Sequence, residues 1–182
     1  SWAGWQQLPG GKSTDAAPAL AVVNDTLYLA YLGNGNSEIN ITSLTSATNN
    51  TWSSQYQIPN QGAKTICMLN EAGSLVIYYQ GTNDNLYRTS TTTPASSSGW
   101  QENSLQYDNG NSTQTSSGQL AVASLGGTTY LAYQGGTSSN SSNTIYLTSS
   151  SSQSTASSWS LVSDIPQANT SAHSGVGLTN LG

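Results

Sequence analysis

The sequence predicts an all-β fold made of about three tandem units of four strands each. Its apolar segments are short, rich in β-branched and aromatic residues, and separated by stretches of Ser, Thr, Asn and Gly. One column recurs along the chain: Tyr31, Tyr79 and Tyr133 are each followed two positions later by a glycine, at spacings of 48 and 54 residues. No segment shows the i, i+3, i+4, i+7 apolar pattern of an amphipathic helix, so we expect no helix.

The first unit illustrates how the four strands of a unit follow one another. We expect its strands over residues 18–23, 26–32, 38–44 and 51–59. In the second of these segments, Leu27, Leu29 and Tyr31 share one face, because side chains alternate between the two faces of a strand. The first and second strands of the three units are joined by short hairpin turns at residues 24–25, 71–73 and 126–127.

A repeat of about 48 residues with four strands is typical of a β-propeller blade. The alternative is a β-sandwich, although a sandwich has no need of a periodic sequence. We therefore expect one propeller-type domain over residues 1–182. Its approximate repeats are 5–51, 52–99 and 100–158, followed by a partial repeat over 159–182.

Both ends of the chain match parts of the repeat. Trp5 and Pro9 fit the pattern of a fourth strand, and Val176 falls in the column of first-strand residues that contains Leu20. Three whole units are too few to close a ring, so we expect two chains to associate as a homodimer of six blades. A fragment of a longer protein is the alternative interpretation.

Composition narrows the possible partners and the compartment. Only 6% of the residues are charged and the net charge is −5, so the chain lacks the basic surface that nucleic-acid binding requires. No stretch reaches the roughly 18 apolar residues of a membrane-spanning helix. Cys67 is the single cysteine, in a column of small residues, and we expect it to be buried and unreactive. N-glycosylation sequons favour a secreted glycoprotein, and they begin at Asn24, Asn40, Asn49, Asn111, Asn140 and Asn169.

The repeat pattern W…IP…APALAV, LYLAY-G, I--TS, W resembles the blades of secreted lectin propellers, namely the tachylectin-type and fungal fucose-binding lectins. Residues 75–90 are similar to a hairpin of the fucose-binding group. The resemblance implies a multivalent carbohydrate-binding protein whose partners are glycans or glycoproteins. The Arg and Glu that hold fucose in that group are absent: the Arg positions carry Tyr28, Val76 and Tyr130, and the Glu positions carry Ile41, Arg88 and Leu147.

Sugar binding requires an aromatic plane for the ring and amide or hydroxyl groups for its hydroxyls. Tryptophans recur once per unit, and polar side chains gather on one hairpin of the second unit. The candidate carbohydrate-binding residues are Trp5, Trp52, Trp100, Trp159, Gln80, Asn83, Asp84, Arg88 and Gln134. Packing between units is the alternative role for the tryptophans.

The residue inventory argues against catalysis and cofactors. No spacing pairs two of the eight acidic residues as acid and base, and His173 has no partner motif. We therefore expect no catalytic residue, no metal ligand and no cofactor, that is, a lectin without enzymatic activity. The alternatives are a degenerate sialidase-like or glycosidase propeller and a structural, protein-binding propeller.

Overall fold

The computed structural model describes residues 7–8, 11–105, 115–135, 145–151, 159–160, 163–164 and 177–178. Every regular element in these ranges is a β-strand, which confirms the predicted all-β class. Within the same ranges there is no helix with the length and apolarity needed to cross a membrane.

The first unit forms where the sequence predicts it. Its strands are β1 (Ala19–Val23), β2 (Thr26–Leu32), β3 (Glu38–Ser46) and β4 (Thr51–Trp52). The turn between β1 and β2 consists of Asn24 and Asp25, which adopt φ angles of 48° and 60°. Asn and Asp tolerate this left-handed backbone, which a two-residue hairpin turn requires, and Val23 and Thr26 pair directly across it.

One long strand joins the first unit to the second. The beginning of β5 (Tyr56–Glu71) pairs with β3, and the remainder pairs with β6 (Ser74–Gly81). The second unit continues through β7 (Leu86–Thr91) and β8 (Gln101–Ser104). The sequence suggested two separate strands here, but β5 serves as the last strand of one unit and the first of the next.

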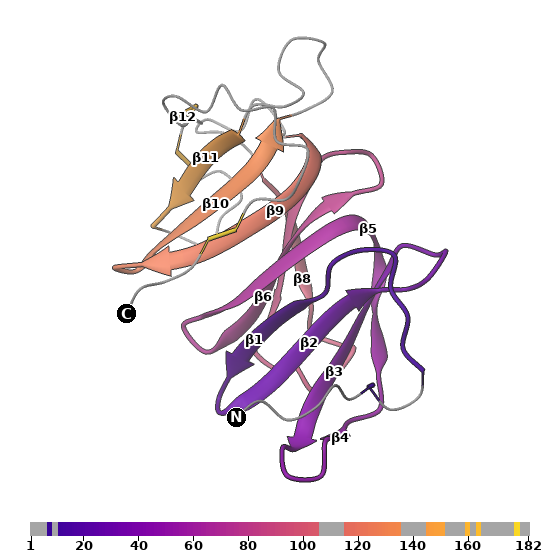
Figure 1. The fold of residues 1–182 in the computed structure, drawn as a ribbon. Coiled ribbons are helices and arrows are strands. Elements are labelled where there is room, and N and C mark those ends of the chain that lie inside the picture. Colours follow the sequence, from indigo (N-terminus) through magenta and orange to yellow (C-terminus); the bar gives the residue numbers. More distant parts are fainter. Residues whose placement is uncertain are drawn as a thin grey trace.

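The third unit is a separate antiparallel sheet. Its strands are β9 (Ser116–Leu125), β10 (Thr128–Gly135), β11 (Ile145–Ser150) and β12 (Ser163–Asp164), in the order β12-β11-β10-β9. The first strands of the three units, β1, β5 and β9, lie side by side in chain order (Figure 1). The described sheets are open, so the number of blades in a closed ring stays a prediction.

The units pack face to face, and the second unit lies between the other two. Along β6, Leu75, Ile77 and Tyr79 belong to the core shared with the first unit, whereas Val76 and Tyr78 belong to the core shared with the third. These five side chains are all 0–2% exposed. The predicted alternation is therefore present, but both faces of the strand are buried because a sheet covers each of them.

A buried polar cluster crosses the contact between the second and third units. Glu71, at the end of β5, accepts hydrogen bonds from Tyr78 Oη (2.7 Å) and from Thr129 Oγ1 of the third unit (3.1 Å). Its other carboxylate oxygen lies 2.8 Å from a terminal guanidinium nitrogen of Arg88. A second guanidinium nitrogen of Arg88 donates to Ser90 Oγ at 2.9 Å. Burial, and secondly the neighbouring Glu71 carboxylate, raise the pKa of Tyr78.

We predict that Glu71→Ala lowers the free energy of unfolding by about 3–5 kcal/mol, because it leaves the Arg88 charge buried without its partner. Urea denaturation followed by tryptophan fluorescence measures this change. Asp25→Asn, in an exposed turn, is the control and should shift the free energy by less than about 0.5 kcal/mol. A loss below about 1 kcal/mol for Glu71→Ala would show that the pair behaves like a surface ion pair.

Candidate functional site

Two hollows that adjoin on the second unit contain the chemistry that sugar recognition needs. Their volumes are about 370 and 200 Å³, and they share Asn60, Gln61 and Glu102 in their linings. We call them together the groove. Its other lining residues are Pro59, Gly62, Tyr79, Gly81, Thr82, Asn83, Tyr87, Ser97, Ser98, Gly99 and Trp100.

Aromatic rings stand at both ends of the groove. Trp100 is half-buried and packs against the core that the first and second units share. Its indole nitrogen donates to the carbonyl of Ser96 at 3.3 Å. At the other end, the rings of Tyr79 and Tyr87 stack at a centroid distance of 5.2 Å and an angle of 20°. The Tyr79 ring is 2% exposed and supports Tyr87, so the half-buried rings of Trp100 and Tyr87 are the planes that suit contact with the apolar face of a sugar ring.

Glu102 lies between the aromatic ends and is the only charged residue among the described lining residues. Its side chain is exposed, and its Oε2 accepts a hydrogen bond from Tyr79 Oη. Burial, and secondly this hydrogen bond, raise the pKa of Tyr79. The Tyr79 phenol is therefore neutral at physiological pH, and its hydroxyl donates the hydrogen bond that orients the Glu102 carboxylate.

Two of the amide side chains in the lining, those of Asn83 and Gln61, are held by hydrogen bonds. The Asn83 amide nitrogen donates to Tyr87 Oη at 2.8 Å and so holds that ring at the rim of the groove. Gln61 is 8% exposed, and its amide nitrogen donates to Thr89 Oγ1 at 3.1 Å. Its Oε1 is buried and finds no partner among the described residues. A buried acceptor without a partner can take a hydrogen bond from a ligand or an ordered water.

The recurring tyrosine–glycine column positions one rim of the groove. A Cβ atom on Gly81 would lie 2.7 Å from the Tyr87 ring and 2.8 Å from Asn83 Oδ1. The glycine thus leaves space for the side chain of the following turn to fold back over the strand end. Asn83 Oδ1 also accepts from the backbone nitrogen of Asn85 at 3.2 Å, which fixes the turn.

The structure separates the other predicted binding residues. Gln80 is buried and donates to Asp84 Oδ1 (2.7 Å) and to the carbonyl of Ser116 (2.6 Å). Asp84 also pairs with Lys64 at 2.6 Å, and this ammonium lowers the pKa of the Asp84 carboxyl. Arg88 is held by Glu71 inside the protein, away from the groove. Gln134 packs over Gly118 on the third unit.

The predicted tryptophans differ in their surroundings. Trp159 is 1% exposed and lies in the core that the second and third units share. Its ring meets the Tyr78 ring edge-on, with 5.5 Å between the ring centroids. Trp52 is half-buried and donates to Asn50 Oδ1 at 3.0 Å within its own hairpin. Trp5 lies outside the described residues, as do His173 and Val176. Of the eight candidates that the structure describes, Trp100 and Asn83 line the groove.

Sequence reasoning missed Glu102, Tyr87 and Gln61 as members of this site. Tyr79 was noted only as a member of the recurring column; its ring is buried, but its hydroxyl donates to Glu102 in the groove. The available signal was weak: Glu102 follows the recurring Trp100 by two positions, so its side chain shares a face with it.

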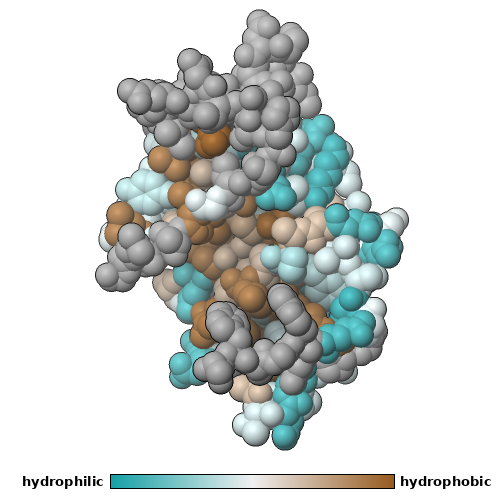
Figure 2. All heavy atoms as spheres, in the orientation of Figure 1, coloured by the Kyte–Doolittle hydropathy of each residue, from teal (hydrophilic) through white to brown (hydrophobic). Residues whose placement is uncertain are grey.

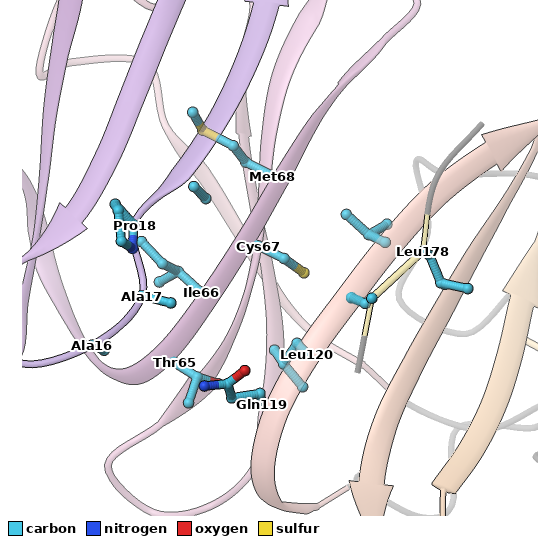
Figure 3. A pocket seen from close by; sticks show the side chains of 14 residues that line it. Ala16, Ala17, Pro18, Thr65, Ile66, Cys67, Met68, Gln119, Leu120 and Leu178 are labelled. Atoms are coloured by element: carbon cyan, nitrogen blue, oxygen red, sulfur yellow. The ribbon is translucent and has the colours of Figure 1, made fainter. Parts of the chain in front are cut away.

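A third hollow, of about 280 Å³, is lined by the first strands of all three units. It is largely apolar, with Ile66, Met68 and Leu120 among its walls, and it lies where apolar residues gather in the middle of the face shown in Figure 2. Figure 3 shows the Cys67 sulfur pointing from β5 toward Leu120 and Leu178. Leu178 therefore lies beside the first strands. Thr65 and Gln119 are the polar side chains in its lining, so this hollow suits contact with apolar side chains better than sugar recognition.

Comparison with known proteins gives structural matches only. No protein-family model matches the sequence, and no curated protein matches it. Among solved structures, an exo-β-1,3-galactanase from Phanerochaete chrysosporium with galactose has a TM-score of 0.56 at 14% identity, over 81% of this chain and 35% of that one. A GH43 enzyme from Xanthomonas citri complexed with xylose has a TM-score of 0.58 at 13% identity, over 81% and 54%. The Aleuria aurantia lectin with Fucα1-6GlcNAc has a TM-score of 0.50 at 13% identity, over 83% and 45%.

These matches support a lectin-like β-propeller fold. The chain spans about a third of the length of the galactanase. The expectation of a protein without enzymatic activity is contradicted, because the similar structures include glycoside hydrolases. That expectation relied on the spacing of acidic residues along the chain, and folding can bring together carboxylates that are distant in sequence.

Cys67 is half-buried, not fully buried as predicted, and it lines the third hollow. Its thiol should still react slowly with thiol reagents in the native protein, because desolvation by the surrounding residues raises its pKa and keeps it in the neutral, unreactive form. Its labelling by a chromogenic disulfide at pH 8 should be at least about tenfold slower in buffer than in urea. Cys67→Ala should cost less than about 1.5 kcal/mol of unfolding free energy. Equal labelling rates in the two conditions would contradict the burial.

Proposed function

We propose that this protein binds carbohydrate in the groove of its second unit. The observation that carries the proposal is the placement of a carboxylate, Glu102, between two aromatic ends formed by Trp100 and Tyr87. Aromatic faces bind the apolar face of a pyranose, and carboxylates and amides bind its hydroxyls, so the groove offers both kinds of contact.

The groove is prepared for binding before a ligand arrives. Tyr79 orients Glu102, Asn83 holds Tyr87, and the Ser96 carbonyl holds the Trp100 indole. Because these side chains are already ordered, little conformational entropy is lost when a ligand binds. A hydrogen bond from a sugar hydroxyl to the Glu102 carboxylate contributes about 1.5–3 kcal/mol.

The similar solved structures support the same chemical class. The galactanase holds galactose, the Xanthomonas enzyme holds xylose, and the Aleuria lectin holds a fucosylated disaccharide. All are proteins that interact with neutral sugars through this type of fold. For the present chain we propose the same class of ligand, polyhydroxylated saccharides, without specifying one sugar.

Trp100→Ala should weaken sugar binding by at least about tenfold, because it removes the stacking plane at one end of the groove. Titration with fucosyl, galactosyl, xylosyl and N-acetylglucosaminyl oligosaccharides, followed by calorimetry, measures the affinity. Trp52→Ala is the matched control: this tryptophan is also half-buried but lies outside the groove, so its removal should leave the affinity unchanged. The proposal fails if no panel member binds the wild-type protein or if Trp100→Ala binds as tightly as Trp52→Ala.

Glycoside hydrolysis is the second candidate function, and the exposed Glu102 carboxylate in the groove favours it. Hydrolysis needs two carboxyl groups about 5–10 Å apart across the scissile bond. Glu102 would supply one of them, and the described lining residues of the groove include no second carboxyl group. The hydrolytic and the binding functions use the same groove and differ in whether the bound glycoside is turned over.

A hydrolytic groove should release the chromophore from aryl galactosides or xylosides, and Glu102→Gln should abolish that release. Binding should weaken by no more than about tenfold, because a neutral hydrogen bond replaces the one to the carboxylate. The amide keeps the size of the carboxyl group and can still accept from Tyr79, but it cannot act as acid, base or nucleophile. Release that is unchanged in Glu102→Gln would rule out Glu102 as the catalytic carboxyl.

Multivalent recognition, homodimer formation and secretion as a glycoprotein stay predictions. The exposed apolar residues among those described are the ones an assembly contact would cover, namely Leu20, Val22, Leu125 and Leu178. Of the predicted sequons, the one at Asn40 is unsuited to glycosylation in the folded chain. That side chain is 3% exposed and donates to the carbonyl of Glu38 at 3.1 Å.

A further inference from the structure

We infer that the first unit carries a second saccharide pocket, which takes a single neutral sugar residue through hydrogen bonds. The inference rests on the proposed function of the groove and extends it to a separate site. The pocket has a volume of about 320 Å³. Its lining residues are Gly11, Lys12, Ser13, Tyr31, Gly33, Asn34, Asn36, Asn40, Gln55 and Gln57, and we call it the first-unit pocket.

The first-unit pocket occupies the same place in its repeat as the Tyr79 end of the groove. Tyr31 and Gly33 line it as Tyr79 and Gly81 line the groove. The repeat therefore builds a hollow at the same end of both units, although no lining residue is shared.

The rim of this pocket is also built in the same way. A Cβ atom on Gly33 would lie 2.0 Å from Asn36 Oδ1, so the glycine again leaves space for an asparagine that folds back over the strand end. Asn36 Oδ1 accepts from the backbone nitrogen of Glu38 at 3.2 Å, which reproduces the turn made by Asn83. The repeated glycine and asparagine therefore give both hollows the same kind of rim.

The two glutamines of the pocket present a fixed donor and a fixed acceptor. Gln55 uses its oxygen to accept from Tyr31 Oη and Lys12 Nζ, which directs its NH₂ group outward. Gln57 uses its NH₂ group to donate to Glu38, which leaves its oxygen free of any partner among the described residues. A sugar hydroxyl both donates and accepts, so neighbouring hydroxyls match this pair.

The lining also indicates how the two sites differ. The described residues of the first-unit pocket include no tryptophan, and its single aromatic residue, Tyr31, is 5% exposed and offers little stacking surface. Amides and one ammonium group dominate instead. We therefore assign this pocket one polyhydroxylated residue bound more weakly than an oligosaccharide in the groove, whose two aromatic ends are separated by Glu102.

Nitrogen-15 NMR of the full chain tests the inference, because glycine amides report on each site. Gly11 and Gly33 line the first-unit pocket, whereas Gly62, Gly81 and Gly99 line the groove. Galactose, fucose, xylose and N-acetylglucosamine, and oligosaccharides of the same sugars, are titrated separately to millimolar concentration. With at least one of them, Gly11 and Gly33 should shift, and the shifts should persist in Trp100→Ala, where groove binding is weakened.

Gln57→Ala should raise the dissociation constant measured at Gly33 by about tenfold and leave that measured at Gly81 unchanged, since it removes one neutral hydrogen bond. Gln101→Ala, an exposed glutamine on β8 outside both sites, is the matched control and should change neither constant. Shifts confined to Gly62, Gly81 and Gly99 would overturn the second pocket while sustaining the groove. Shifts confined to Gly11 and Gly33 would sustain the pocket and overturn the groove, and an absence of shifts in both sets would overturn both.

Discussion

The structure depends on the burial of β6 on both of its faces. Leu75, Ile77 and Tyr79 are buried against the first unit, and Val76 and Tyr78 against the third. Each fully buried apolar side chain of this size contributes about 1.5–3 kcal/mol. A single four-stranded sheet cannot cover both of its own faces, so the units are stable only when stacked in succession. The strand arrangement of Figure 1 is the geometric result of this requirement.

Directional polar contacts add precision to this apolar stacking. Glu71 contacts Tyr78 and Arg88 of its own unit and Thr129 of the next. The hydrophobic effect is non-directional, whereas hydrogen bonds weaken steeply when misaligned, so a carboxylate with three donors has one optimal position. The cluster therefore sets the alignment of the third unit on the second, at the desolvation cost of a buried ion pair.

Stacking also determines where a ligand can bind. It encloses the tyrosine rings but leaves their hydroxyls at the strand ends, where Tyr79 meets Glu102 and Tyr31 meets Gln55. Beside each tyrosine, a glycine admits an asparagine from the next turn. The repeat thus provides the same scaffold twice, and the last strand and its preceding loop give each hollow its own chemistry: Trp100 and Glu102 in one, amides in the other.

Most strand positions, the hairpin turns and the recurring tyrosine–glycine column could be predicted from the sequence, because they follow from local periodicity and from backbone conformations that Asn, Asp and Gly adopt easily. The column pattern also assigned Cys67 to a first strand, and β5 contains it. The fold was needed to show that β5 continues from the first unit into the second, that Arg88 pairs with Glu71, that Trp159 packs inside, and that Glu102 joins the aromatic residues of the groove. These pairings join different strands and, at the core contacts, different units, and no local pattern encodes which side chains meet when one sheet is laid on another.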